Sequence, residues 1–191
     1  MKTLRFALLV SACMIAACQK NGEANDAAVN DQTAGSENIA IDNGMAGMAN
    51  ESAASTVDSA FVTEGMQGDN GEVAIGNLAA TKASSQAAKD FGKMLATDHG
   101  AHKQKLAALA SNAGIPITDE PSDEGKANLD KLKGLSGAAF DKAFKQAMID
   151  DHQKDIAKYE KQASSGDPQT SALAKETLPT LRKHLATAQS L

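Results

Sequence analysis

Four histidines are the side chains of this 191-residue chain best suited to chemistry. His99 and His102 lie in one predicted helix, His152 in a second and His184 in a third. Successive side chains turn by about 100° around a helix, which places His102, His152 and His184 among apolar residues and His99 at the edge of an apolar face. Imidazoles that point into a helical core either hydrogen-bond there or bind a metal.

Carboxylates share the predicted buried faces with these histidines. An unpaired carboxylate in a core costs several kcal/mol, so each must be paired, hydrogen-bonded or bound to a metal. One hypothesis is a set of histidine–carboxylate hydrogen bonds that hold the helices in register, and the other is a metal site built from facing helices. The candidate metal ligands are Glu72, Asp98, His99, His102, Asp151, His152, Asp155 and His184.

The spacing argues against a carboxylate-bridged di-iron centre. Ferritin-like di-iron proteins carry Glu-x-x-His on two helices, whereas the residue three before His102 is another histidine and the one three before His184 is a leucine. If a metal binds, we expect a single transition-metal ion held by Glu72, His99 or His102, His152 and His184. No serine-hydrolase elbow, phosphate-binding glycine loop or zinc-protease motif is present, which favours a protein without enzyme activity.

Four long helices are needed to position these groups. Their bounds, predicted from capping residues and from glycine and proline stops, are Asp58 to about Lys82, Ser84 or Ser85 to about Asn112, Ser136 to Gly166, and Asp167-Pro168 onward. Short links make each sequential pair antiparallel, and the long link 113–135 holds a short helix near Lys126 to Lys133. This pattern predicts an all-α, ferritin-like antiparallel four-helix bundle with a long crossover between helices 2 and 3. Gly68-Asp69-Asn70-Gly71 marks a weak point in the first helix, where a break or bulge would loosen the presentation of Glu72.

Residues 1–18 predict a lipoprotein signal peptide. Two basic residues precede an apolar stretch too short to span a bilayer, and Ile15-Ala16-Ala17-Cys18 resembles a lipobox. We expect lipidation at Cys18, with Cys13 and an ordinary secretory signal as alternatives. Gln19 after the cysteine favours transfer to the outer membrane, so we expect a lipid-anchored periplasmic protein; a soluble secreted or periplasmic protein is the alternative.

Composition separates a tether from a domain. Residues 19–56 are small, polar and acidic, which predicts a disordered tether. Residues 57–191 are rich in Ala, Leu, Lys and acid, and they contain no cysteine, which excludes disulfides and thiolate metal sites there. Acidic and basic side chains nearly balance in this domain, so nothing recruits nucleic acid. The expected partner is the membrane, through the N-terminal lipid; the sequence does not identify a protein partner or small ligand.

Four segments resemble the DUF4142 family of bacterial exported proteins, which is placed among ferritin-like proteins. They are Phe61 through Glu72 to Ala83, Phe91 to His99, Leu135 to Asp141 with Asp151-His152, and Thr177 to Leu185. The resemblance covers residues 57–191 and implies an exported four-helix bundle, often a lipoprotein, without an established activity. We therefore expect a membrane-tethered periplasmic bundle with a binding or envelope-stress role. The alternatives are a metal-binding or metal-dependent redox protein and a structural envelope lipoprotein.

Overall fold

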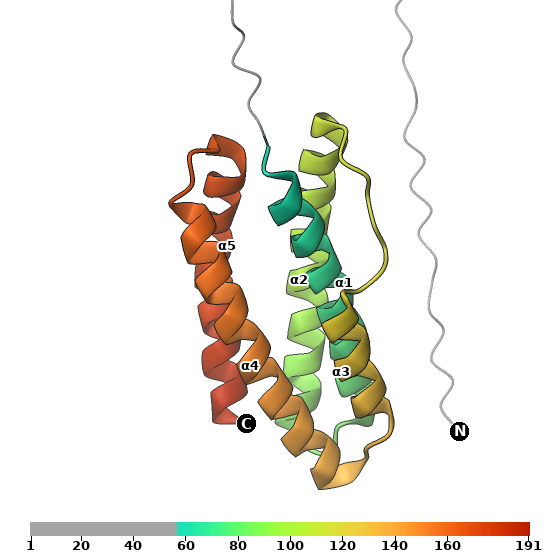
Figure 1. Ribbon diagram of the computed structural model, residues 1–191. Coiled ribbons are helices and arrows are strands. Elements are labelled where there is room, and N and C mark those ends of the chain that lie inside the picture. Colours follow the sequence, from blue (N-terminus) through green and yellow to red (C-terminus); the bar gives the residue numbers. More distant parts are fainter. Residues whose placement is uncertain (1–56) are drawn as a thin grey trace, which may run out of the picture. The chain divides into compact units, whose positions relative to one another are not determined.

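A computed structural model describes residues 57–191, which form five helices and no strand (Figure 1). The helices are α1 (Ser59–Lys82), α2 (Gln86–Ala113), α3 (Asp123–Lys133), α4 (Gly137–Ala163) and α5 (Pro168–Ser190). The all-helical prediction is thus confirmed for these residues. None of the helices in this range is long and apolar enough to span a membrane. The predicted lipidation site Cys18, its alternative Cys13 and the predicted tether 19–56 lie outside the described residues.

Side chains cap four of the five helix N-termini of residues 57–191, including the predicted caps Asp58, Ser85 and Asp167, whereas the predicted cap Ser136 begins α4 without a side-chain hydrogen bond. The Asp58 carboxylate accepts a hydrogen bond from the backbone N–H of Phe61 at 3.0 Å, at the start of α1. Gly114 ends α2 with a left-handed backbone, φ 69°, a conformation that costs glycine little. Helix α4 ends at Ala163, three residues before the predicted stop, because residues 164–166 form the turn that brings Asp167 to the N-terminus of α5.

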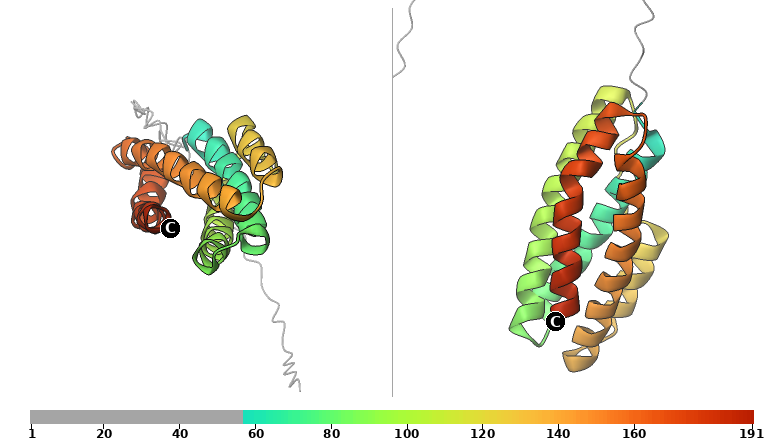
Figure 2. Two further views of the ribbon diagram at one scale, coloured as in Figure 1. Left: turned by 90° about the horizontal axis from the view of Figure 1, so that it is seen from below. Right: turned by 90° about the vertical axis from the view of Figure 1, so that its left-hand side faces the viewer.

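The four long helices pack as two sequential hairpins, α1 with α2 and α4 with α5 (Figure 2). Two glycines bring α1 and α2 unusually close together. A Cβ atom on Gly76 would lie 2.6 Å from the backbone oxygen of Gly92, and a Cβ on Gly92 would lie 2.6 Å from that of Gly76. No larger residue fits at this crossing without moving a backbone, so the sequence sets the separation of this hairpin.

The crossover between the hairpins is anchored on α1. The Asn70 side-chain amide donates hydrogen bonds to the backbone oxygens of Thr118 at 3.0 Å and Glu120 at 3.2 Å. Beside it, a Cβ on Gly71 would lie 3.4 Å from the Cα of Gly125, so α3 packs close to α1 here. The predicted break or bulge in α1 is therefore wrong. The helix continues without interruption through residues 68–71, and the crossover packs on this run.

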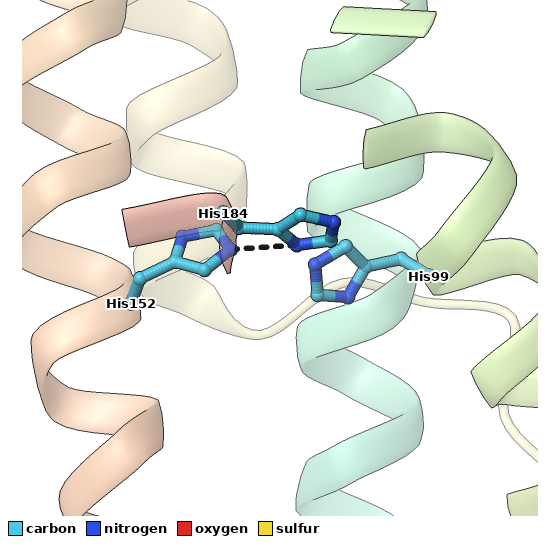
Figure 3. Close-up of side chains that lie close together, drawn as sticks. All are labelled: His99, His152 and His184. Carbon is cyan, nitrogen blue, oxygen red and sulfur yellow. Dashed lines mark hydrogen bonds between the residues drawn. The ribbon is translucent and has the colours of Figure 1, made fainter. Parts of the chain in front are cut away.

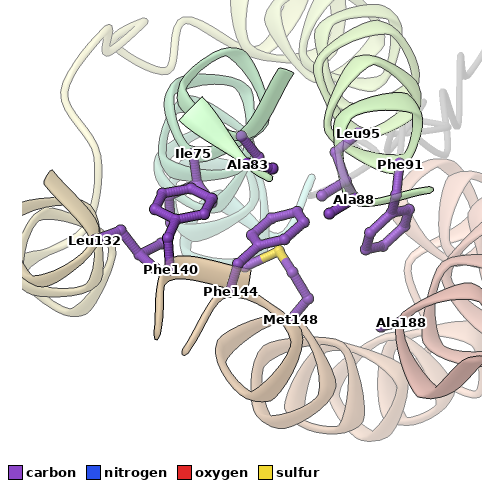
Figure 4. Close-up of a cluster of buried hydrophobic side chains, with 11 residues drawn as sticks. Ile75, Ala83, Ala88, Phe91, Leu95, Leu132, Phe140, Phe144, Met148 and Ala188 are labelled. Atoms are coloured by element: carbon purple, nitrogen blue, oxygen red, sulfur yellow. The ribbon is translucent and has the colours of Figure 1, made fainter. Parts of the chain in front are cut away.

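The core consists of two apolar clusters. The first surrounds Phe91, Phe140 and Phe144 (Figure 4), and the second surrounds Phe61, Leu106 and Tyr159. Along each of the four long helices, the residues of one cluster and those of the other are separated by at least one ionisable residue. A polar layer therefore crosses the interior between two apolar ends.

Candidate metal centre

The polar layer contains every residue that the sequence predicted as a candidate metal ligand. Helices α1, α2 and α4 contribute members about one turn apart, and α5 contributes a histidine. The members are Asp69, Glu72, Asp98, His99, His102, Asp151, His152, Asp155 and His184. Most are buried, while the side chain of Asp98 stays 34% exposed. The structure thus gathers the predicted residues into one region, but it does not give them one role.

Three of the four histidines converge within this layer. His99 from α2, His152 from α4 and His184 from α5 each offer one ring nitrogen, and these nitrogens lie within 4.8 Å of one another (Figure 3). Exposure is 5% for His99 and 0% for His152 and His184. We call these residues the histidine trio. One histidine comes from the first hairpin and two come from the second, so the trio spans the boundary between the hairpins.

Hydrogen bonding determines which nitrogen of His152 carries a proton. Its Nδ1 lies 2.9 Å from the backbone oxygen of Met148, and a carbonyl oxygen can only accept, so Nδ1–H is the donor. Burial, followed by the nearby His99 and His184, lowers the pKa of His152 to about 3, and the ring is neutral at pH 7. The lone pair of a neutral ring with a protonated Nδ1 is on Nε2.

The other two rings are anchored by carboxylates. Nε2 of His184 lies 2.9 Å from Oδ2 of Asp98 and donates to it, which leaves the lone pair on Nδ1. Nδ1 of His99 lies 2.8 Å from Oδ1 of Asp69 and donates to it, which leaves the lone pair on Nε2. This Nε2 atom is buried and has no hydrogen-bond partner among the described residues. Three anchored N–H groups thus turn three lone pairs towards one another (Figure 3).

Such an arrangement attracts a cation. Nε2 of His152 and Nδ1 of His184 are 3.2 Å apart, and facing lone pairs at that separation repel unless a proton or a metal ion lies between them. Metal-ligating histidines characteristically donate their second N–H to a carbonyl or carboxylate, as all three do here. No carboxylate oxygen joins the trio among residues 57–191, so a carboxylate-bridged di-iron centre does not fit.

Asp69 is the functional residue that sequence reasoning missed. Its two carboxylate oxygens accept hydrogen bonds from Nδ1 of His99 and Nδ1 of His102, both at 2.8 Å. Burial alone would raise the pKa of Asp69, but the hydrogen bonds from His102 and His99 lower it, so the group is ionised. Its position three residues before Glu72, on the same helix face, was the available signal.

His102 lies outside the trio. Besides its bond to Asp69, its Nε2 lies 3.4 Å from the Tyr159 hydroxyl, which donates to it. The sequence left His99 and His102 as alternatives, and the structure places only His99 with the other two histidines. His102 instead continues a hydrogen-bonded chain that leads away from the trio through Asp69.

Glu72, Asp151 and Asp155 form an acidic side of the layer. Both Glu72 oxygens are buried, and neither accepts a hydrogen bond from an N–H or hydroxyl group of the described residues. Burial, followed by the adjacent Asp151 carboxyl, raises the pKa of Glu72 well above its usual range. Burial, followed by Asp151, also raises the pKa of Asp155 to about 7. Oε1 of Glu72 is 3.8 Å from Nδ1 of His152, so this acidic side adjoins the trio.

Comparisons with known proteins address the fold and the family. A search of curated proteins gave no significant match. Among solved structures, the chain is similar to the crystal structure of a DUF305 fragment from Deinococcus radiodurans, with a TM-score of 0.62 and 16% sequence identity. That similarity covers 69% of this chain and 92% of the fragment, and it concerns the helical fold alone. Residues 43–191 match the family described as Domain of unknown function (DUF4142), and the chain belongs to that family.

Proposed function

We propose that this protein binds a single transition-metal ion through His99, His152 and His184. The observation that carries the proposal is the direction of the three imidazoles. Each has one N–H fixed by an acceptor outside the trio, and the remaining nitrogens lie within 4.8 Å of one another. Three neutral nitrogens suit zinc, copper, iron or nickel better than calcium or magnesium, which prefer oxygen ligands.

A purely structural hydrogen-bond network is the competing explanation. It accounts for the bonds of Asp69 to His99 and His102 and for the bond of Asp98 to His184. It does not account for the unpartnered Nε2 of His99. A proton shared between Nε2 of His152 and Nδ1 of His184 would satisfy their 3.2 Å contact, but it would leave Nε2 of His99 unpaired. A metal ion would satisfy all of these lone pairs at once, so we favour binding over a structural role alone.

The setting we propose is an exported, ferritin-like four-helix bundle anchored to the outer membrane through Cys18. Support for the anchor comes from the lipobox-like sequence Ile15-Ala16-Ala17-Cys18. Support for the bundle comes from two helical hairpins joined by the crossover through α3. In the periplasm such a protein would sequester or carry a metal, which is compatible with an envelope-stress role.

Metal analysis of the purified full-length protein tests this function. After loading with Zn²⁺, Cu²⁺ or Co²⁺ and removal of free metal, we expect one ion per chain by elemental analysis. His152→Ala and His184→Ala should abolish stoichiometric binding. His102→Ala is the matched control, since His102 is a buried histidine of the same layer outside the trio, and it should retain the ion. Absence of stoichiometric metal from the folded wild-type protein would refute the proposed function.

A further inference from the structure

Tyr159 is the single tyrosine of the chain, which has no tryptophan, and residues 57–191 contain no cysteine. Phenol, indole and thiol are the side chains that lose one electron most readily, so in this domain that chemistry is confined to one residue. Tyr159 is 4% exposed and packs edge-on against Phe61, with ring centroids 5.0 Å apart. Burial, followed by Asp69 and Asp155, raises the pKa of Tyr159 well above its usual range, so the hydroxyl keeps its proton in the resting protein.

A chain of hydrogen bonds joins Tyr159 to the histidine trio. The Tyr159 hydroxyl donates to Nε2 of His102, with 3.4 Å between the two atoms. Nδ1 of His102 donates to one oxygen of Asp69 and Nδ1 of His99 donates to the other, both at 2.8 Å. Because His99 belongs to the trio, the phenol is connected to a proposed metal ligand through His102 and one shared carboxylate.

The four side chains of this hydrogen-bonded chain also line one small cavity. Its volume is about 20 Å³, which is room for about one water molecule. Glu64 and Lys158, an ion pair at 2.6 Å with partly exposed side chains, line the cavity as well, so it lies close to the surface. The phenol is therefore near His99 in space as well as through hydrogen bonds, and a bulky reductant in solution has no room to reach it.

We propose that Tyr159 donates one electron to hydrogen peroxide that reacts at a redox-active ion in the histidine trio, with His102 as the acceptor of its proton. Cleavage of the O–O bond of peroxide takes up two electrons. A reduced ion such as Cu⁺ gives one, and that electron alone would release a hydroxyl radical. Tyr159 gives the other, so the products are Cu²⁺, a tyrosyl radical, a protonated His102 and two hydroxide ions. This inference rests on the proposed function, because the first electron comes from the bound ion.

His102 is well placed to take the phenolic proton. In the neutral ring, Nδ1–H is bound to Asp69, so the lone pair of Nε2 faces the Tyr159 hydroxyl. The hydrogen bonds from His102 and His99 keep Asp69 ionised, and an ionised carboxylate behind an imidazole stabilises the imidazolium that forms when the ring accepts a proton. Electron loss and proton loss from Tyr159 can therefore occur together, without a buried phenol cation.

Rapid mixing of the full-length, Cu⁺-loaded protein with hydrogen peroxide tests the inference. The readouts are the EPR signal and the sharp visible absorption of a tyrosyl radical, which in a chain with one tyrosine can arise only from Tyr159. Wild type should form the radical, and the metal-free protein should not. Tyr159→Phe keeps the ring and the copper site, so it should bind copper, form no radical and release more hydroxyl radical to a spin trap than wild type does.

Two further variants separate this role of His102 from a general effect on the cavity. His102→Ala should retain copper but lower the yield of the radical by at least about tenfold, because the phenolic proton loses its acceptor. Asp155→Asn alters another side chain that lines the cavity and leaves the hydrogen-bonded chain intact, so it should form the radical as wild type does.

Copper content, measured on the same samples, distinguishes two kinds of failure. The inference alone is overturned if copper-loaded wild type forms no tyrosyl radical, if His102→Ala forms as much of it, or if Tyr159→Phe releases no more hydroxyl radical. If folded wild-type protein binds neither copper nor another transition metal, the proposed function fails and the inference fails with it.

Discussion

Nε2 of His152 and Nδ1 of His184 lie 3.2 Å apart, at hydrogen-bond distance, on two helices of the same hairpin. Each ring is held in that orientation from behind, His152 by the Met148 carbonyl and His184 by the Asp98 carboxylate. Neither ring can turn away without breaking its anchoring hydrogen bond. The second hairpin therefore holds a preformed pair of imidazoles, and His99 of the first hairpin completes the trio.

Metal binding should stabilise the protein, because the ion would join the two hairpins. With free metal about a thousandfold above Kd, linkage adds about 4 kcal/mol to the free energy of unfolding. For a chain of this size that corresponds to roughly 10 °C in Tm. Thermal unfolding followed by circular dichroism, with and without Zn²⁺, measures the shift. His184→Ala should show none, and an equal shift in that variant would mean that the metal binds elsewhere.

Replacement of Asp69 by asparagine should weaken both metal binding and the fold. Asparagine can accept only through its oxygen, so one of the two N–H groups of His99 and His102 loses its acceptor. We expect metal affinity to fall by about 10- to 100-fold, as for other residues that anchor metal ligands. The free energy of unfolding of the metal-free protein should fall by about 1–3 kcal/mol.

Chelator competition and urea unfolding measure these two effects of Asp69→Asn. Asp90→Asn is the matched control, because Asp90 is an exposed aspartate of α2 whose partners are Gln86 and Lys93. It should leave metal affinity unchanged. A wild-type affinity in Asp69→Asn would show that the orientation of His99 does not depend on this carboxylate.

Asp155 should make the metal-free protein less stable as pH rises. Its pKa is about 7 in the folded protein against an ordinary value of 3.8, because burial and Asp151 disfavour its charged form. The folded state thus binds this proton more tightly, and its contribution to stability is complete below about pH 4 and is lost as pH rises through 7. In wild type this lowers the free energy of unfolding by about 3 kcal/mol between pH 4 and pH 8, and Asp155→Asn should not show this decrease.

The measurement is urea unfolding of wild type and Asp155→Asn in chelator at several pH values from 4 to 8. Burial lowers the pKa of His152 and of His184, which favours the opposite trend below pH 6.5. That trend is common to both proteins, so the difference between them isolates Asp155. A difference that is constant with pH would contradict the raised pKa.

Gly76→Ala should disrupt the α1–α2 hairpin. The new Cβ would lie 2.6 Å from the backbone oxygen of Gly92 and 2.9 Å from the backbone nitrogen of Ala96, and neither can move without shifting α2. We expect a loss of about 1–3 kcal/mol or more in the free energy of unfolding. Gly100→Ala on α2, whose Cβ would meet open space, should instead stabilise by about 0.5–1 kcal/mol through helix propensity. Equal effects of the two substitutions, measured by urea unfolding, would contradict this explanation.

Sequence reasoning predicted the helices well because their ends depend on neighbouring residues. Asp58, Ser85 and Asp167 accept hydrogen bonds from backbone N–H groups two or three residues on, and Gly114 adopts the left-handed turn after α2. These interactions span one turn of chain. The break predicted at Gly68–Gly71 is absent because contacts with the crossover offset the helix-breaking composition of this run. The crossover residue Thr118 is 48 residues away in sequence, so local spacing does not reveal these contacts.

The sequence also predicted that the residues of the polar layer are buried. It did not predict which of them contact one another. Helical periodicity alone placed Glu72, His152 and His184 on inward faces. Whether His99 or His102 meets the other histidines depends on how far the first hairpin is shifted and rotated against the second, and a change of one turn would exchange them. Only the packed structure decides that, and it also decides that Asp69 anchors His99 and His102.

The chain by itself therefore determines the helices, their caps and the ionisable residues that they bury, because each follows from contacts within a turn or from the 3.6-residue period. The tertiary structure alone decides which three imidazoles converge, which atoms anchor their N–H groups, and that Glu72 lies 3.8 Å from the ring of His152. Those features depend on contacts between groups far apart in sequence, whose geometry is set by packing across the hairpins.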